Sequence, residues 1–224
     1  WLNKIKKTDS YKLAWYPLNE KDIPPTQDKE YDVCYHGGMH GDKYIEMLGD
    51  IMRFNYRYMT MTHGINLLTQ NCVPYATDLN LSNKEKMERI AQCKISVCMN
   101  SFTVRGEADL NNIKSQPHYL DNDAFIHAEK HRLCPQIKSR MNEAAACKTL
   151  NLVEKDLWNV AETFYRPDEH FVYFEKGNLT EAITEVLDHW DIYEGLVESS
   201  YRHFKNNFTT ESLYKRIKED GEKS

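Results

Sequence analysis

Short apolar runs alternate with longer amphipathic stretches along the chain from Tyr31 onward. Between the first two runs, Tyr44, Leu48 and Ile51 recur at helical spacing. The runs have the length and the β-branched or aromatic content of buried strands, and they cover residues 31–36, 56–60, 95–99, 149–153 and 171–174. This alternation predicts one Rossmann-like α/β domain, a mostly parallel sheet with helices on both faces.

Two helix beginnings carry capping-box patterns, in which side chains satisfy the orphan backbone amides of a helix start. The patterns run from Ser82 to Glu85 and from Asn178 to Glu181. The polar, irregular segment 101–120 predicts a long loop. Further helical stretches are predicted at about 123–132, 136–147 and 157–164, and from the second capping box to about residue 219.

The polar beginning of the chain differs from the rest. Residues 1–30 contain Pro17, Pro24 and Pro25, and they predict an extended lead-in before a domain at 31–224. The sequence opens on Trp1 rather than Met. We therefore expect the domain to be part of a larger protein, with neighbouring domains among its partners.

Composition narrows the class of protein. Of 224 residues, 41% are hydrophobic and 28% are charged, which is typical of a soluble globular domain. No uncharged apolar run approaches the roughly 20 residues of a membrane span. The net charge of −5 argues against a sequence-independent grip on nucleic acid. Six cysteines without C-x-x-C spacing indicate buried free thiols in a reducing compartment, and hence a cytoplasmic protein.

The first candidate site is the run Gly37-Gly38-Met39-His40-Gly41, which follows the first predicted strand. Ligands of doubly wound sheets bind beyond the carboxyl ends of the strands, where glycines let the backbone approach a phosphate. The alternative is a tight turn without a ligand, because the run is not G-x-G-x-x-G and lacks the acidic residue that holds a ribose in NAD enzymes. His36 and His40 are the candidate catalytic bases, or charge partners of a phosphate.

The second candidate site is the segment 135–147, where Lys138 falls in the first turn of the predicted helix. Lys138 and Arg140 could clamp a diphosphate, the arginine with a planar fork and the lysine as a point charge. Glu143 could accept hydrogen bonds from both hydroxyls of a ribose. The alternative is a solvated helix face of mixed charge.

These segments resemble the C-terminal half of GT-B glycosyltransferases. Pro135–Val153 and Pro167–Phe174 follow a pattern of proline, basic pair, Glu-Ala-small-small-Cys, apolar strand and Pro-x-Glu-x-Phe-Val strand. Tyr31–Gly38 resembles the first strand and glycine turn of that half, and Lys84–Asn100 its middle helix and strand. The resemblance covers most of residues 30–210. It extends to glycosyltransferase modules of large algal viruses, including a rhamnosyltransferase domain.

The resemblance implies that this half binds a nucleotide-sugar donor. The glutamate would bind the ribose, the basic pair the diphosphate, and the two glycines would approach the phosphates. The remaining positions would lie near the base or the sugar. The implied donor-binding residues are Gly37, Gly38, Asn100, Ser101, His127, Lys138, Arg140 and Glu143.

Two positions depart from the retaining enzymes of that family. Those enzymes have a second Glu eight residues before the position of Glu143, where this sequence has Pro135, and a Gly where it has Lys148. The broken signature favours an inverting transfer, which needs a base to deprotonate the acceptor hydroxyl. His40, His36 or a residue of an N-terminal half outside this chain would supply that base.

The implied enzyme transfers a sugar from a nucleotide-diphosphate sugar to a hydroxyl of a glycan or glycoprotein acceptor. A UDP-sugar is favoured as the donor, and a 6-deoxyhexose such as rhamnose is a candidate sugar. This interpretation requires no metal ion or other cofactor.

Two other interpretations stay open. Asp121-Asn122-Asp123 is a D-x-D, with which GT-A glycosyltransferases hold Mn²⁺ or Mg²⁺ against the donor, although a helix cap in a polar loop also explains it. His127 and His131 have the spacing of some zinc sites, but no third ligand is identifiable. The non-enzymatic alternative is a Rossmann-like interaction module with a vestigial pocket.

Overall fold

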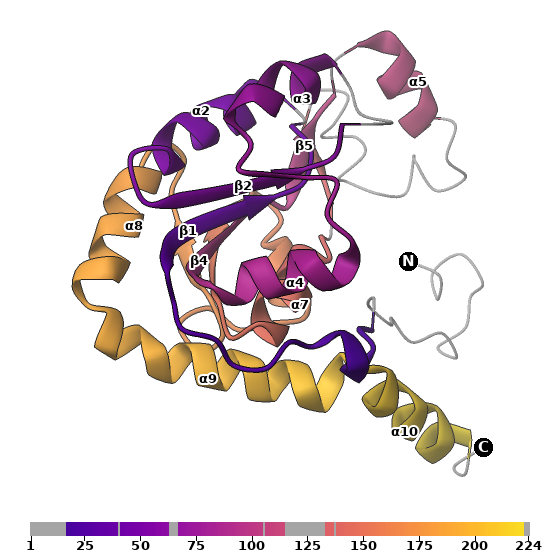
Figure 1. The fold of residues 1–224 in the computed structure, drawn as a ribbon. Coiled ribbons are helices and arrows are strands. Elements are labelled where there is room, and N and C mark those ends of the chain that lie inside the picture. Colours follow the sequence, from indigo (N-terminus) through magenta and orange to yellow (C-terminus); the bar gives the residue numbers. More distant parts are fainter. Residues whose placement is uncertain are drawn as a thin grey trace.

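The structure is a computed structural model, and it describes residues 17–39, 41–62, 67–104, 106–114, 133–136 and 138–221. Within these ranges, strands pair in parallel to form one six-stranded sheet in the order β3-β2-β1-β4-β7-β8 (Figure 1). The strands are β1 (Tyr31–His36), β2 (Tyr56–Thr60), β3 (Asp78–Leu79), β4 (Cys93–Cys98), β7 (Leu150–Glu154) and β8 (Val172–Phe174). The strand order reverses between β1 and β4, and ligands of such sheets bind at this switch point.

Helices cover both faces of the sheet, which confirms the predicted fold class. One face packs against α2 (Asp42–Ile51), α3 (Leu67–Cys72) and α8 (Leu179–Asp188). The other packs against α4 (Asn83–Ala91) and α7 (Arg140–Ala146). The long helix α9 (Trp190–Asn207) joins the two layers, and α10 (Thr210–Gly221) follows it (Figure 1).

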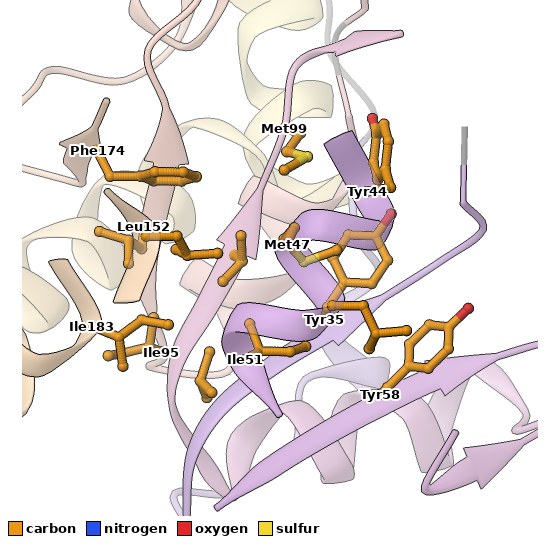
Figure 2. Packing of buried hydrophobic residues seen from close by; sticks show 14 of the residues in the cluster. Tyr35, Tyr44, Met47, Ile51, Tyr58, Ile95, Met99, Leu152, Phe174 and Ile183 are labelled. Atoms are coloured by element: carbon orange, nitrogen blue, oxygen red, sulfur yellow. The ribbon is translucent and has the colours of Figure 1, made fainter. Parts of the chain in front are cut away.

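Alternate residues of β1 divide the core between the two faces. Val33 and Tyr35 belong to the cluster on the α2 and α8 side, whereas Cys34 belongs to the cluster on the α4 and α7 side. Figure 2 shows the first cluster, where the ring of Tyr35 lies 6.1 Å from that of Tyr44 and 6.0 Å from that of Tyr58. Because the strand is apolar on both sides, the sheet is stable only when both faces are covered.

Two segments far apart in the sequence are joined near the end of α9. The backbone N–H of Leu18 donates to the carbonyl of Phe208 at 2.9 Å, and the N–H of Thr210 donates to the carbonyl of Leu18 at 3.0 Å. The Glu20 carboxylate accepts from the N–H of Glu211 at 2.8 Å, at the start of α10. We call these residues the terminal clasp. The described part of the predicted lead-in is otherwise irregular, apart from the 3₁₀ turn η1 (Glu20–Asp22).

The helix predicted from Gln136 begins at Arg140 instead, so Lys138 precedes α7 rather than lying in its first turn. Residues 133–136 are committed elsewhere. The strand β6 (Leu133–Pro135) pairs antiparallel with β5 (Ser101–Thr103), and the N–H of Gln136 donates to the carbonyl of Asn100 at 2.7 Å. These pairings hold residues 133–136 in extended backbone before α7 begins.

Three further predictions were wrong in part. The long loop predicted at 101–120 contains β5 and the helix α5 (Glu107–Lys114). The helix predicted at 157–164 is only the 3₁₀ turn η4 (Val160–Thr163), because the Asp156 carboxylate accepts from the N–H groups of Trp158 and Val160 and fixes a turn there. The side chain of Asn178 makes no capping hydrogen bond at the start of α8.

Other predictions are confirmed. The capping box of Ser82 and Glu85 is formed at the start of α4. All six cysteines are buried.

The 3₁₀ turn η2 (Val73–Tyr75) follows α3, in a region for which the sequence predicted no element. The helix predicted at 123–132 lies outside the described residues. None of the helices in the described ranges has the length and apolar character needed to cross a membrane.

Candidate functional site

A cavity of about 410 Å³ lies at the carboxyl ends of β1 and β2, on the side of the sheet where α4 and α7 begin. It brings together six of the predicted site residues, which are His36, Gly37, Gly38, Lys138, Arg140 and Glu143. The other lining residues are Met59, Thr60, Met61, Leu81, Asn83, Lys86 and Ser139. The cavity therefore combines an apolar wall from β2 with a charged wall from α4 and α7.

The glycine turn after β1 allows a close approach of the arginine. Gly37 has a φ of +133°, in the region that favours glycine, and its N–H donates to the carbonyl of Met59 at 2.9 Å. A side chain on Gly37 would collide with the guanidinium group of Arg140. The carbonyl of Gly38 accepts from the Tyr35 hydroxyl at 2.8 Å, which fixes the next residue of the turn.

Arg140 is the first residue of α7 and is buried beneath this turn. Its Nε donates to the carbonyl of His36, and its guanidinium carbon lies 4.5 Å from the centroid of the Tyr35 ring. Its Nη1 is buried and has no hydrogen-bond partner among the described residues. Leaving a buried donor unsatisfied is costly, so this nitrogen favours binding of an acceptor in the cavity.

Lys138 places a second positive charge on the same wall. Its ammonium group donates to the side-chain oxygen of Gln136. Burial and the nearby charge of Arg140 lower the pKa of Lys138 to about 8. Two neighbouring cations that destabilise each other are stabilised by an anion between them, and this wall has the charge of an anion-binding site.

Glu143 lies one turn into α7 and faces the side chains of His36 and Lys86. Its Oε2 is 2.8 Å from Nε2 of His36, and its Oε1 accepts from the ammonium group of Lys86 at 3.0 Å. Burial alone would raise the pKa of Glu143, but the contacts with His36 and Lys86 outweigh it and hold the pKa well below its ordinary value. The carboxylate is therefore ionised at neutral pH.

Asn100 and Ser101 lie near the cavity but not in its lining. The amide of Asn100 contacts the sulfur atoms of Cys98 and Met141. The Ser101 hydroxyl accepts from Lys43 at 2.7 Å, and Lys43 also pairs with Glu154 at 2.7 Å. Both predicted residues are buried among their own partners.

Other predicted residues cannot be placed. His40, Asp121, Asp123, His127 and His131 lie outside the described residues. In the ranges that the structure describes, no three His, Cys, Asp or Glu side chains are grouped as metal ligands.

Sequence reasoning missed Lys86 and the apolar wall of Met59, Met61 and Leu81. Lys86 belongs to a predicted helix with several charged residues, and nothing in that local pattern distinguishes it from the exposed Lys84. Met59 lies near the end of the second predicted strand, Met61 directly follows that strand, and Leu81 directly precedes the predicted capping box. The position of the two methionines at a carboxyl strand end was the available signal for a ligand-facing role.

A cavity at the carboxyl ends of parallel strands, with glycines, a buried arginine and a lysine in its walls, is typical of Rossmann-like domains that bind phosphorylated ligands. Comparison of the sequence with family models identifies the family. Residues 78–219 match the model of the family described as glycosyl transferase-like, which is more than half of the chain, and the protein belongs to this family. Comparison with curated proteins gives no match.

Solved structures share the fold at low sequence identity. HepE from Anabaena, solved with UDP and glucose, is 8% identical with a TM-score of 0.60, over 95% of this chain and 57% of HepE. Sucrose-phosphate synthase from Thermosynechococcus elongatus is 11% identical with a TM-score of 0.61, over 97% and 53%. The C-terminal domain of the glycosyl transferase LpcC from Francisella tularensis is 10% identical with a TM-score of 0.51, over 86% and 99%. The chain thus spans little more than half of the first two proteins and has the α/β fold of one GT-B half.

Proposed function

We propose that this domain is the donor-binding half of a glycosyltransferase and that its cavity holds a nucleotide-diphosphate sugar. One observation carries the proposal. Arg140 and Lys138 line the same wall, Arg140 retains a buried nitrogen without a partner among the described residues, and the pKa of Lys138 is lowered to about 8. A diphosphate supplies the acceptor atoms and the negative charge that this wall lacks.

Other lining residues of the cavity support binding of the remaining parts of a nucleotide. The backbone of Gly37 and Gly38 lies beside the cation wall, as needed for close approach to phosphate oxygens. The Glu143 carboxylate lines the same cavity and can accept from the two hydroxyls of a ribose. The apolar side chains Met61 and Leu81 then offer a surface for the base.

Catalysis in this proposal rests on the leaving group. When the bond between sugar and diphosphate breaks, negative charge develops on the diphosphate, and Arg140 and Lys138 stabilise it. Pro135 stands where retaining enzymes carry a glutamate, which supports an inverting transfer. The base that deprotonates the acceptor comes from His40 or from a neighbouring domain of a longer polypeptide.

The donor and acceptor of this proposal are those that the sequence resemblance implies. The donor is a UDP-sugar, with a 6-deoxyhexose such as rhamnose as the candidate sugar, and the acceptor is a glycan or glycoprotein hydroxyl. HepE, which has a similar fold, was solved with UDP and with UDP-glucose, and this supports UDP as the first nucleotide to test. The kinship with algal virus enzymes stays a prediction, as does a cytoplasmic location.

The test is calorimetric titration of the protein with UDP, GDP and ADP, each with Mn²⁺ and with a chelator. We expect one nucleotide to bind without metal, and Arg140→Ala and Glu143→Ala each to weaken binding tenfold or more, because each removes a charge-assisted hydrogen bond. Lys84→Ala on the exposed face of α4 is the matched control and retains full affinity.

Three results would contradict the proposal. Binding that requires Mn²⁺ would favour a GT-A type enzyme that uses Asp121 and Asp123. Absence of binding by every nucleotide would favour an interaction module. Full affinity in both Arg140→Ala and Glu143→Ala would show that the nucleotide binds elsewhere.

A further inference from the structure

We propose that His36 and Lys86 are positioning residues that hold the Glu143 carboxylate toward the ribose, and that this clamp makes binding depend on the ribose hydroxyls. The inference rests on the proposed function and deepens it. We call Glu143, His36 and Lys86 the carboxylate clamp. The three residues come from α7, from the end of β1 and from α4, and all three line the cavity.

The clamp fixes both oxygens of one carboxylate. Nε2 of His36 lies 2.8 Å from Oε2, and Nζ of Lys86 lies 3.0 Å from Oε1. The side chains of His36 and Glu143 are 4% and 8% exposed, so water does not replace either partner. Each carboxylate oxygen has about two lone-pair directions. One contact per oxygen therefore leaves one direction per oxygen for a ligand hydroxyl, and two hydroxyls match the two free directions.

Without its contacts to His36 and Lys86, the carboxylate would be a poor acceptor. A carboxyl group this buried tends to take up a proton, and a protonated carboxyl loses acceptor strength. The contacts with His36 and Lys86 reverse that tendency and hold the pKa of Glu143 well below its ordinary value. The clamp thus supplies two properties, ionisation and a fixed orientation, and both are needed to bind a vicinal diol.

His36 is placed to orient and not to exchange protons with an acceptor. Both of its ring nitrogens are buried, and Nδ1 has no hydrogen-bond partner among the described residues. Nε2 is directed at Glu143. The carbonyl of the same residue accepts from Nε of Arg140. One residue therefore holds the ribose carboxylate with its side chain and the phosphate-binding arginine with its backbone, which fixes the spacing between the two subsites.

Lys86 acts from the rim of the cavity. Its side chain is 26% exposed, and it reaches Glu143 from the second turn of α4. Its neighbour Lys84 is exposed on the same helix. Lys86→Met retains most of the aliphatic stem and removes the charge, whereas Lys86→Arg retains the charge. Lys84→Met is a matched control for the loss of one positive charge on α4.

The experiment compares UDP, GDP and ADP with their 2′-deoxy counterparts by calorimetry in the wild type and in the variants. We expect the wild type to bind the preferred ribonucleotide at least tenfold more tightly than its deoxy counterpart. In Lys86→Met and His36→Gln this ratio falls to less than about threefold, while affinity for the deoxynucleotide changes less than about twofold. Lys86→Arg and Lys84→Met retain the wild-type ratio. A purely structural role would weaken both nucleotides equally and leave the ratio unchanged.

The outcomes separate the two proposals. If the wild type distinguishes the two sugars and both variants still do so, the clamp is overturned while the proposed function stands. If the wild type binds no nucleotide, the proposed function fails and the clamp with it. Thermal unfolding monitors the fold of each variant. Should His36→Gln fail to fold, Lys86→Met decides the question, because its side chain lies at the rim.

Discussion

Glu143 and Glu154 are buried carboxylates near the carboxyl ends of the strands. Each forms an ion pair with a lysine, but the surroundings of the two pairs differ. Glu143 lines the cavity, and its partner Lys86 is 26% exposed. Glu154 is absent from the lining, and its pair with Lys43 is closed, with side chains 12% and 9% exposed. The Lys43 ammonium also donates to the Ser101 hydroxyl at 2.7 Å.

The two ion pairs differ in what they can do: the pair of Lys43 and Glu154 is structural, whereas the pair of Lys86 and Glu143 faces the cavity. A closed ion pair contributes to folding only as long as both partners remain, because either partner alone is a buried charge. An open pair next to a cavity keeps lone-pair directions of its carboxylate available to a ligand. Ser101 contacts the closed pair, which joins α2 to β7, and its role near the donor stays a prediction.

The largest effect is expected from breaking the closed pair. Lys43→Met leaves Glu154 buried and unpaired, and we expect the free energy of unfolding to fall by about 3–5 kcal/mol. Urea denaturation measures it. The double variant with Glu154→Leu recovers much of the loss, since it removes the orphaned charge. If Lys43→Met costs no more than Lys86→Met, the distinction between the closed and the open pair is wrong.

The glycine turn is the next point at which to break the site. Gly37→Ala places a methyl group in the space of the Arg140 guanidinium and strains a positive φ, with an expected loss of about 1–3 kcal/mol in stability. Nucleotide affinity falls with it, because the arginine is displaced. Gly49→Ala is the control, since its side chain meets open space on α2 and raises stability by roughly 0.5–1 kcal/mol. Thermal unfolding compares the two, and equal stability of both would contradict the packing of Gly37 against Arg140.

The cavity wall that contains Lys138 and Arg140 predicts that nucleotide binding depends on pH. Lys138 carries its charge below its pKa of about 8 and loses it above, and only the charged form attracts a diphosphate. Affinity is therefore expected to fall as pH rises, by about tenfold at pH 9, where about one molecule in ten remains charged. Lys138→Arg keeps its charge and flattens the profile. Calorimetry from pH 7 to 9.5 measures both proteins, and a flat wild-type profile would remove Lys138 from the phosphate site.

The smallest effect is expected from a substitution outside the cavity. Ser82→Ala removes the capping box of α4, and we expect a loss of about 1 kcal/mol in stability. Nucleotide affinity should remain within twofold, because Ser82 is not among the lining residues. A large loss of affinity would mean that the start of α4 must be held rigidly for binding.

The fold and the place of the cavity could be predicted from the sequence because both depend on local patterns of residues. The alternation of strands and helices gave the sheet, and the position of Gly37 at a carboxyl strand end located the cavity. The ion pairs left no such pattern, since Lys86 and Glu143 are 57 residues apart and Lys43 and Glu154 are 111 apart. Charged residues on a predicted helix indicate a solvent-exposed face as long as the strand or helix that packs against them is unknown.

The beginning of α7 shows a second limit of local reasoning. A helix was predicted from Gln136, yet the N–H of Gln136 is paired with the carbonyl of Asn100, and residues 133–135 before it pair with β5. Pairing with a segment more than thirty residues earlier overrides local propensity. As a result, Arg140 lies in the first turn of a helix, whereas Lys138 lies in the loop before it.

The terminal clasp has a mechanical consequence. Leu18 and Thr209 form a parallel bridge, and the chain enters at one end of this bridge and continues into α10 from the other. A pull applied at Pro17 and at the end of α10 therefore loads the bridge in shear, along the strand direction, with its hydrogen bonds strained together. The six-stranded sheet therefore bears tension from such a pull only after these hydrogen bonds have broken.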